Sequence, residues 1–281
     1  MSALAYVNGT ITPLAEARLP LLDRGVFFGD GVYDTLFSIN GRLHAPERHF
    51  RRLAHSLHET GIGAISIEEI ESALAELSGR CEHRDVDFYI QVTRGVQPAR
   101  AHTWKEEPRP TLIITAQERH DLPAEHYARG VTLFSHTDLR WGRCDIKSVN
   151  LLPNVMARQK AAAAGGYDAL LVRDGHVTEG SGSSVLIVEE GVLVAPPLSY
   201  EILPSITREI VLELAREAGV PVRLERRTLE QYIQADEAMV LSTKVGVLPV
   251  RAIDSVELPT ERPLIERLRA LYQETVQALA E

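Results

Sequence analysis

The chain of 281 residues has a formal net charge of −9 and 44% hydrophobic residues, which is enough material for two domains with cores of their own. The acidic balance argues against a general nucleic-acid binder, because such a protein needs a basic face that neutralises phosphates. No apolar run reaches the length of a membrane span, and the first residues lack the pattern of a secretory signal. We therefore expect neither membrane insertion nor secretion.

Cysteine and histidine usage limits the kinds of site that can be expected. Cys81 and Cys144 are far apart, which predicts neither a disulfide framework nor a cysteine-based metal site and favours a reducing, cytoplasmic location. The ten histidines show no His-x-x-x-His or His-Glu-x-x-His spacing. We therefore expect no metal ion.

The first part of the chain is predicted to alternate strands and helices. Residues 6–11 are typical of the start of a hairpin. A helix is predicted over 46–59, with its apolar residues on one face. Another helix begins at Ser66, where Ser66 and Glu69 form a capping box, and ends near Gly79.

The strand predicted over 86–93 has a strict alternation. Phe88, Ile90 and Val92 face one way, whereas Tyr89, Gln91 and Thr93 face the other. One side of this strand is therefore free to line a pocket. A short apolar strand follows at 111–116.

The polar stretch 117–130 marks a predicted domain boundary. We expect a small α/β domain at 1–119, a linker at 120–130 and a larger domain at 131–281. The larger domain is predicted to be richer in strand. Its predicted strands cover 131–135, 168–172, 183–188, 192–195 and 237–242, and its predicted helices cover 151–164, 206–218, 228–235 and 262–279.

Lys147 is the most informative single residue, because it is one of only four lysines in the chain. It directly precedes Ser148. A partly buried lysine can lose its proton near neutral pH, whereas arginine cannot, and only a neutral amine attacks a carbonyl. A carboxylate, Glu179, follows in a Ser/Gly-rich turn. The pair suits a Schiff-base enzyme, while a surface lysine beside a strand end is the alternative interpretation.

Pyridoxal phosphate would need an amine, an acid for its pyridine nitrogen, a phosphate cradle and a grip on the substrate carboxylate. Glu179 is the candidate acid. Ser205 is the expected N-cap of a helix whose free amides and dipole suit a phosphate. Ser242 and Thr243 could add donors at a strand end, and Arg52 could add a charge.

The substrate carboxylate could be bound by Arg100 and His102. Arg100 offers a planar fork that matches a carboxylate, and His102 is close enough in sequence to add a donor. Tyr33, in a glycine-dense segment, is a possible third donor. This segment lacks the third glycine or the Gly-Lys-Ser/Thr of nucleotide-binding loops.

Taken together, the motifs resemble the fold-type IV pyridoxal-phosphate enzymes, and among these the D-amino-acid (D-alanine) aminotransferases. Arg100-Ala101-His102, Tyr33 and the run up to Lys147-Ser148 favour the latter group. The motifs are Asp23-Arg24-Gly25, Phe28-Gly29-Asp30-Gly31-Val32-Tyr33, Val92-Thr93-Arg94-Gly95, Arg140-Trp141-Gly142-Arg143-Cys144-Asp145-Ile146-Lys147-Ser148, Val177-Thr178-Glu179-Gly180-Ser181 and Ile206-Thr207-Arg208.

The resemblance implies an α+β fold of two domains, a smaller N-terminal α/β domain and a larger, β-rich pseudo-barrel that binds pyridoxal 5'-phosphate. It implies a ping-pong transamination between a D-amino acid and a 2-oxo acid, of the D-alanine/2-oxoglutarate type. It also implies a homodimer with its sites near the subunit interface.

The resemblance assigns roles to individual residues. Lys147 would form the aldimine with the cofactor and then move a proton between substrate Cα and cofactor C4′. Glu179 would pair with the pyridine nitrogen, and Leu203 would pack on the ring. The phosphate would be bound by Arg52, Ile206, Thr207 and Thr243, and the α-carboxylate by Tyr33, Arg100 and His102.

The chain departs from the pattern in places that concern the substrate range. The spacing from Gly95 to Arg100 is one residue longer than usual, Ser184 replaces a common Asn, and Phe37 could favour apolar substrates. Branched-chain L-amino-acid transaminase, (R)-amine transaminase and aminodeoxychorismate lyase remain alternatives of the same fold. Outside it, a non-catalytic dimeric scaffold and a lysine-dependent hydrolase remain.

Overall fold

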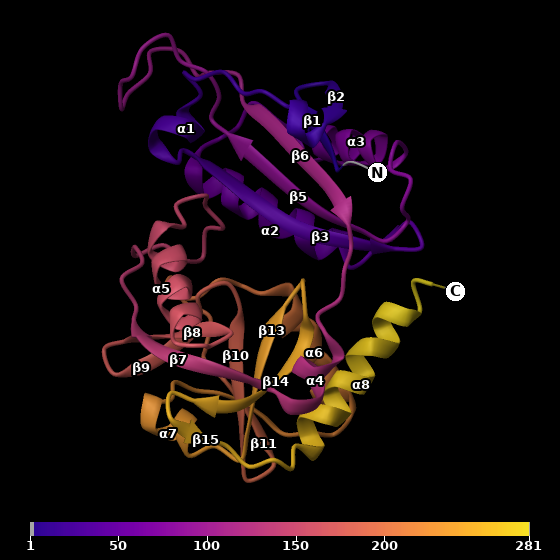
Figure 1. Ribbon diagram of the computed structural model, residues 1–281. Coiled ribbons are helices and arrows are strands. Elements are labelled where there is room, and N and C mark those ends of the chain that lie inside the picture. Colours follow the sequence, from indigo (N-terminus) through magenta and orange to yellow (C-terminus); the bar gives the residue numbers. More distant parts are fainter. Residues whose placement is uncertain (1–2, 281) are drawn as a thin grey trace. The chain divides into compact units, whose positions relative to one another are not determined.

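The computed structural model describes residues 3–280, which divide into two compact units (Figure 1). Unit 1 contains the described residues up to His120, the segment Ile146–Asn150 and the two described residues Leu279 and Ala280. Unit 2 contains Asp121–Asp145 and Leu151–Ala278. Within residues 3–280, no helix combines the length and the apolar character that a bilayer crossing requires.

Unit 1 is built on a six-stranded sheet in which neighbouring strands run antiparallel, in the order β2-β1-β6-β5-β3-β4. The hairpin predicted near the N-terminus is confirmed, because Val7 pairs with Thr10 across the turn. The strand predicted over 86–93 is confirmed as β5. The strands are β1 (Leu4–Val7), β2 (Thr10–Pro13), β3 (Gly31–Ile39), β4 (Arg42–Leu43), β5 (Val86–Thr93) and β6 (Thr111–Glu118).

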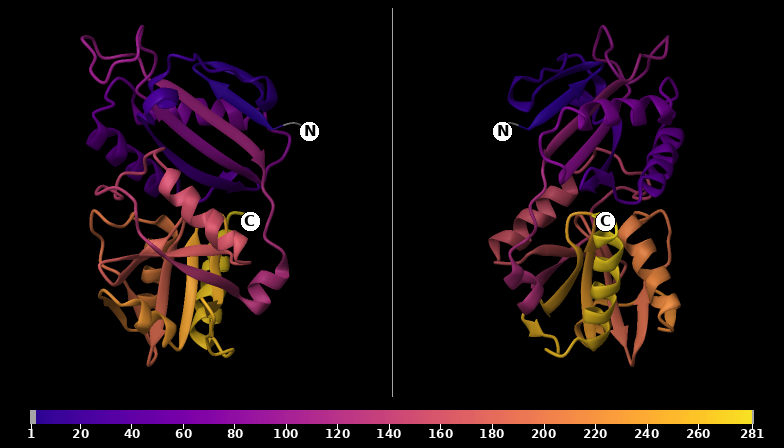
Figure 2. Two further views of the ribbon diagram at one scale, coloured as in Figure 1. Left: turned by 60° about the vertical axis from the view of Figure 1, so that its left-hand side comes forward. Right: turned by 90° about the vertical axis from the view of Figure 1, so that its right-hand side faces the viewer.

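Helices α2 (Pro46–Thr60) and α3 (Ile67–Ser78) cover one face of this sheet (Figure 2). Phe88 and Ile90 of β5 are buried in the core beneath them, as their alternation predicts. The capping box of Ser66 and Glu69 is confirmed at the start of α3. The short elements η1 (Leu14–Glu16) and α1 (Arg24–Phe28) complete the unit. The opposite face of β5 is left to polar side chains.

Unit 2 contains a nine-stranded sheet with the order β12-β11-β10-β13-β14-β7-β8-β9, and β15 pairs with β14. Strands β9 and β12 stand at opposite ends of this order. Val177 N in β9 nevertheless donates to the carbonyl of Arg227, a residue shortly after β12, at 2.9 Å, so the sheet curls round on itself. This confirms the predicted pseudo-barrel. The strands are β7 (Val131–Thr137), β8 (Asp168–Arg173), β9 (His176–Gly180), β10 (Ser184–Glu189), β11 (Val192–Ala195), β12 (Val222–Leu224), β13 (Glu237–Ser242), β14 (Gly246–Ile253) and β15 (Val256–Glu257).

The helices of unit 2 pack around the barrel, whose interior is filled by aliphatic side chains and by Tyr232. Helix α5 contacts β7 and β8, and α6 contacts α8 (Figure 1). Helix α4 lies in the stretch that the sequence predicts as a linker. The helices are α4 (Ala124–Arg129), α5 (Leu152–Ala163), α6 (Ile206–Glu217), α7 (Leu229–Ile233) and α8 (Pro263–Gln277).

Candidate functional site

Lys147 is carried by the segment Ile146–Asn150, which belongs to unit 1 and runs along the start of β3. Tyr33 N donates to Lys147 O at 2.9 Å, as in a strand pair. Lys147 N donates to Ser56 Oγ of α2 at 3.1 Å. The backbone of Lys147 is therefore fixed by two elements of unit 1, which limits where its side chain can reach.

The side chain of Lys147 is half-buried and lies beside aromatic rings. Its Nζ is 4.4 Å from the ring centroid of Tyr33, and the Tyr33 ring is 5.4 Å from that of Tyr89. The Tyr89 hydroxyl donates to Gln91 Oε1 at 2.7 Å. Burial raises the pKa of Tyr89, and the neighbouring Tyr33 adds to this rise, so Tyr89 is a protonated donor. The polar face predicted for β5 thus lies next to Tyr33, the residue that Lys147 contacts.

Arg52 is buried and is held by Asp34 of β3. Its Nε and Nη2 donate to the two carboxylate oxygens at 2.8 and 2.7 Å, and His49 Nδ1 lies 2.8 Å from Asp34 Oδ1. Burial by itself raises the pKa of Asp34, but the charge of Arg52 and the bonds from His49 and Arg52 hold it well below its usual range. The guanidinium is therefore a charged group in a fixed orientation, which is the type of donor that binds a phosphate.

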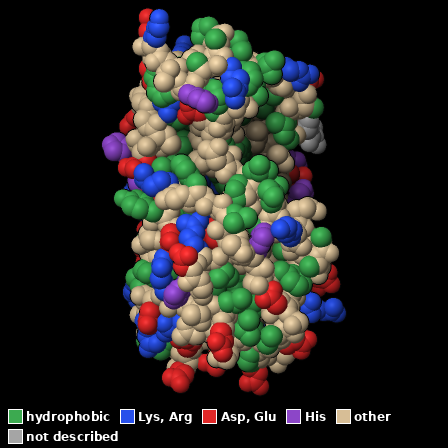
Figure 3. Space-filling view, turned by 90° about the vertical axis from the view of Figure 1, so that its left-hand side faces the viewer, with side chains coloured by type: hydrophobic (Ala, Val, Ile, Leu, Met, Phe, Trp, Pro, Cys, Tyr) green, Lys and Arg blue, Asp and Glu red, His purple; other side chains and the backbone are tan. Residues whose placement is uncertain are grey.

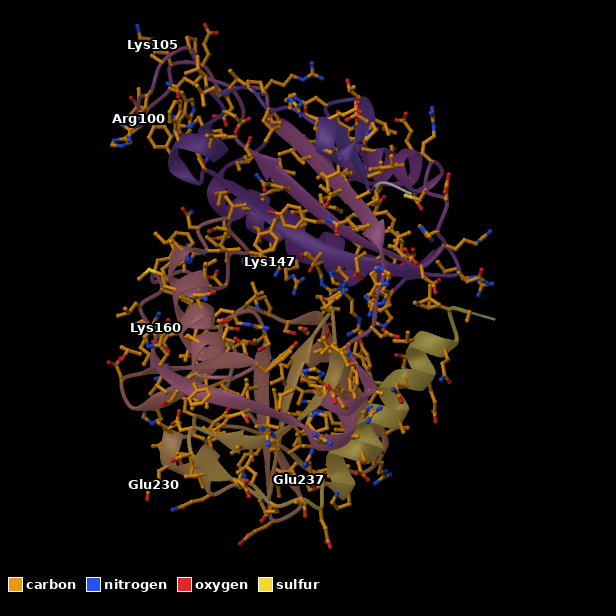
Figure 4. All side chains as sticks on the ribbon, in the orientation of Figure 1. Arg100, Lys105, Lys147, Lys160, Glu230 and Glu237 are labelled. Carbon is orange, nitrogen blue, oxygen red and sulfur yellow. The ribbon has the colours of Figure 1, made fainter. Side chains whose placement is uncertain are left out.

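Arg100 and His102 lie in the loop between β5 and β6, and both are exposed. The Arg100 guanidinium is 5.0 Å from the Phe28 ring centroid, and the His102 ring is 5.3 Å from it. Figure 4 places Arg100 at the outer end of unit 1, well separated from Lys147 of the same unit. One chain therefore brings Tyr33 to Lys147, but it does not bring Arg100 there.

Glu179 lies in β9 of unit 2 and is 5% exposed. Arg140 Nη1 donates to its Oε1, and the Leu203 amide donates to both of its oxygens at 3.2 and 3.3 Å. Arg140 Nη2 also donates to Asp138 Oδ2 at 2.8 Å. The sequence motifs include Arg140 without indicating a role for it, and Asp138 lies outside them.

The charges around Glu179 are mutually stabilised. Burial lowers the pKa of Arg140, but the bond to Asp138 and the charge of Glu179 outweigh burial and raise it. Burial raises the pKa of Asp138, but the bonds and the charge of Arg140 outweigh burial and lower it. Near neutral pH the guanidinium is charged, and it pairs with the carboxylates of Asp138 and Glu179.

The start of α6 offers amide donors to an anion. Ser205 is the N-cap, as predicted, and its Oγ accepts from Arg208 N at 3.3 Å. The amides of Ile206 and Thr207 have no acceptor within the helix, because they belong to its first turn. Together with the positive end of the helix dipole they fit a phosphate dianion.

The remaining predicted residues of unit 2 also have defined places. Ser242 is the last residue of β13, where it pairs with Gly246, and Thr243 follows it, half-buried. Leu203 is half-buried two residues before the N-cap of α6. Unit 2 therefore holds the carboxylate and the amide donors, and unit 1 holds the amine and Arg52. Within the described residues, no group of three or more His, Cys, Asp or Glu side chains is placed to hold a metal ion.

Known proteins resemble this chain over most of its length. The sequence pattern of the family described as Amino-transferase class IV matches residues 31–253. A D-alanine aminotransferase of Bacillus licheniformis is 38% identical over 259 residues, which cover 91% of this chain and 90% of that protein.

Solved structures resemble it as well. The branched-chain aminotransferase of the archaeon Thermoproteus uzoniensis, solved with norvaline, has a TM-score of 0.88 and 25% identity, over 99% of this chain and 96% of that one. The 4-amino-4-deoxychorismate lyase of Pseudomonas aeruginosa has a TM-score of 0.84 and 28% identity, over 96% of this chain and 98% of that one. Each of these two matches extends over both units of the chain.

Proposed function

We propose that this chain, which belongs to the class IV aminotransferases, transfers the amino group of a D-amino acid to a 2-oxo acid such as 2-oxoglutarate. The observation that carries the proposal is Lys147, held beside Tyr33 by β3 and α2. The D-alanine aminotransferase of Bacillus licheniformis supports the choice of D-amino acids, because its identity of 38% exceeds the 25% of the branched-chain enzyme of Thermoproteus uzoniensis.

Pyridoxal 5'-phosphate is the cofactor that we propose, because its aldehyde, pyridine nitrogen and phosphate each match the chemistry of a predicted residue of this chain. A branched-chain amino acid aminotransferase with the same fold has been solved with pyridoxamine 5'-phosphate, which supports this choice. When bound, the cofactor supplies an electron-withdrawing ring that stabilises negative charge at the substrate Cα. Lys147 would attach to its aldehyde, and Glu179 would keep its pyridine nitrogen protonated. Its phosphate would be bound by Arg52, Ile206, Thr207, Ser242 and Thr243, and Leu203 would pack on its ring.

Lys147 has a second task in this proposal. Its Nζ would hold and move a proton at the substrate Cα, where the bound cofactor would stabilise the negative charge. The anchoring of its backbone to Tyr33 and Ser56 limits the positions that the amine can reach.

The substrate carboxylate would be bound by Tyr33, Arg100 and His102. Because Arg100 is remote from Lys147 in its own chain, we propose that the active form is a homodimer in which Arg100 and His102 serve the site of the other copy. Exposed apolar side chains of unit 1, Leu21, Val26 and Val96, would be covered in such a dimer. Hydrophobic side chains reach the surface in the upper part of Figure 3.

The substrate class is tested by assaying the purified enzyme with D-alanine, L-leucine and (R)-1-phenylethylamine, each with 2-oxoglutarate. Turnover with D-alanine that exceeds the other two by at least about a hundredfold, the effect of about 3 kcal/mol, is the expected result. Preference for L-leucine or for the amine would instead assign the branched-chain or the (R)-amine reaction. Release of product without an oxo acid acceptor would assign a lyase.

The shared site is tested by mixing the variants Lys147→Ala, which should be inactive, and Arg100→Ala, which should have a raised KM, at substrate concentrations below that KM. A mixed dimer has one site with intact Lys147 from one copy and intact Arg100 from the other, so activity should reappear. If both residues served the site of their own chain, every site in the mixture would stay defective. Each variant assayed alone, at the same total protein concentration, is the control.

A further inference from the structure

The loop that carries Arg100 and His102 is held by contacts that local spacing in the sequence does not reveal. Arg24, the first residue of α1, is 4% exposed and directs its guanidinium at this loop. Its Nη1 donates to Ala101 O at 2.7 Å, and its Nη2 donates to His102 O at 3.1 Å. One buried cation thus holds the two carbonyl groups that follow Arg100.

Gln97 connects Arg24 to the far side of the same loop. Its Oε1 accepts a hydrogen bond from Arg24 Nη1, and its Nε2 donates to Thr103 O at 2.9 Å. A side-chain amide can accept at one end and donate at the other, which a carboxylate cannot do near neutral pH. Gln97 therefore acts as a cross-link between residues 97 and 103, on either side of Arg100.

Trp104 and Asp30 fix the two arginines that hold the base of the loop. The Trp104 ring centroid is 4.9 Å from Arg24 Cζ and 4.2 Å from Arg94 Cζ. Asp30 Oδ2 accepts from Arg24 Nε at 2.7 Å and from Arg94 Nε at 3.0 Å. The cations share one carboxylate and contact one indole, so Arg24 is held in place before any substrate arrives.

We propose that Arg24 and Gln97 are positioning residues for the substrate carboxylate. They hold the backbone at residues 101–103, so that Arg100 and His102 are presented in one arrangement while their side chains remain exposed. A loop without these cross-links would be ordered only when substrate binds, and that ordering would weaken binding. The inference rests on the proposed carboxylate role of Arg100.

Substitution of Arg24 or Gln97 should change the kinetic constants in a particular way. Both half-reactions of a transaminase bind a carboxylate, so the KM of the amino acid and the KM of the oxo acid should rise together. The kcat should stay nearly constant, because these substitutions leave Lys147 and the residues that hold it unchanged. A general loss of folding would instead lower the bound cofactor and kcat.

The first test is Gln97→Ala in the holoenzyme, with Glu106→Ala as the matched control. Glu106 is an exposed side chain of the same loop outside the contacts described above. Loss of two hydrogen bonds should raise both KM values about tenfold, with kcat within about twofold and the visible absorbance of the bound cofactor unchanged. Unchanged KM values in Gln97→Ala, or an equal rise in Glu106→Ala, would overturn the inference.

Arg100→Ala separates this inference from the proposed function. If Arg100→Ala leaves both KM values unchanged, the carboxylate role of Arg100 fails. If it raises them and Gln97→Ala does not, only the positioning role fails. In the double variant, Gln97→Ala should raise the KM values at most about twofold above those of Arg100→Ala, because the guanidinium that Gln97 positions is already absent. Full additivity of the two effects would contradict the inference.

Arg24→Lys provides a second variant and a readout other than activity. Lysine keeps the charge beside Asp30 but cannot bind both carbonyls with a planar fork. Hydrogen exchange of the peptide that covers residues 97–105 should accelerate in Arg24→Lys and in Gln97→Ala, and stay at the wild-type rate in Glu106→Ala. Wild-type exchange rates in both positioning variants would overturn the inference.

Discussion

Lys147 Nζ lies 4.4 Å from the centroid of the Tyr33 ring, so the amine and the phenol of one unit occupy adjacent positions. The same two residues are joined through the backbone, where Tyr33 N donates to Lys147 O at 2.9 Å. Tyr33 therefore contacts both the backbone and the amine of Lys147. A side chain that must move a proton at a defined carbon benefits from such contacts.

The ring and the hydroxyl of Tyr33 should have separable effects. Tyr33→Phe keeps the ring beside Lys147 and loses only the hydroxyl, so we expect a KM for the amino acid raised about tenfold and a nearly unchanged kcat. Tyr33→Ala also removes the ring, and we expect kcat to fall by at least about tenfold as well. Steady-state kinetics with D-alanine measures both. The assignment fails if Phe and Ala variants behave alike.

Asp34 should be essential for the stability of unit 1, because it neutralises the buried Arg52. Asp34→Asn leaves the guanidinium without its carboxylate, and we expect a loss of about 3–5 kcal/mol in the free energy of unfolding. Urea denaturation without added cofactor measures it. Adding Arg52→Met to Asp34→Asn should recover part of the loss, since no buried charge then lacks its partner. A double variant that is as unstable as the sum of the singles would contradict this explanation.

Arg140 should stabilise unit 2 most strongly near neutral pH. It pairs with Asp138 and Glu179, both of which are nearly fully buried. Arg140→Met leaves two carboxylates without this cation, and we expect a loss of several kcal/mol at pH 7. In the native protein Asp138 has a lowered pKa, so its contribution is present above the unfolded pKa and is lost as the pH falls.

The difference between native protein and Arg140→Met should accordingly persist down to about pH 3.8 and shrink at lower pH. Urea midpoints measured at pH 7, 4 and 3 check this trend. Arg216→Met, which removes a cation from the last turn of α6, is the control and should show a small difference at every pH. A difference between Arg140→Met and native protein that is constant with pH would contradict the ionic role of Arg140.

His44 should make the protein sensitive to mild acid. Its ring is stacked on Phe37 with centroids 4.8 Å apart, and the Arg119 guanidinium lies 3.9 Å from the same Phe37 ring. Burial, with added effects of His49, Arg119 and Arg48, lowers the pKa of His44 from 6.5 to about 4. Because the folded pKa lies below the unfolded one, protonation favours the unfolded chain, and stability is lost as the pH falls from about 6.5 to about 4.

We expect this effect to reach on the order of 3 kcal/mol at pH 4 relative to pH 7. His44→Gln cannot titrate, so the stability difference between native protein and this variant should change by that amount across the window. Urea denaturation at half-unit steps of pH measures it. The exposed His58→Gln is the control. A flat difference between native protein and His44→Gln would refute the explanation.

Patterns among residues close in sequence are sufficient to predict several elements of the fold. The alternation in β5, the capping box at Ser66 and the N-cap at Ser205 are all decided by residues close in sequence. Strand β14 was not predicted, and Pro249 lies in its middle, where it pairs with Met239. Proline lacks the N–H of a regular ladder, so its presence argues against a strand unless tertiary context overrides it. Helix α4 is short and lies in a polar stretch.

The site could be predicted only as a set of residue types. Lys147 and Glu179 are found from chemistry and motif, but their local settings are not: Lys147 lies in a segment beside β3, and Glu179 lies in strand β9 and not in a turn. The partners that fix the charges, Asp34 for Arg52 and Asp138 for Arg140, are found only once the chain has folded. Asp34 follows Tyr33 in β3 and faces α2, a relationship that requires the packing of the helix on the sheet.

Substrate range is also a question of packing. Phe37 could favour apolar substrates according to the sequence, but its ring is 1% exposed and lies against His44 and Arg119. The polar pair Tyr89 and Gln91 lies instead beside Tyr33 and Lys147. The separation of Arg100 from Lys147 likewise depends on the course of the loop between β5 and β6, which spacing along the chain does not determine.

The central claim is that Lys147 is the residue that binds the cofactor aldehyde. The chain has only four lysines, Lys105, Lys147, Lys160 and Lys244, so the attachment site can be determined without ambiguity. The holoenzyme is reduced with borohydride, digested, and its peptides are identified by mass spectrometry. A pyridoxyl phosphate group on the peptide that contains Lys147 is the predicted result, and its presence on another lysine, or on none, would contradict the account.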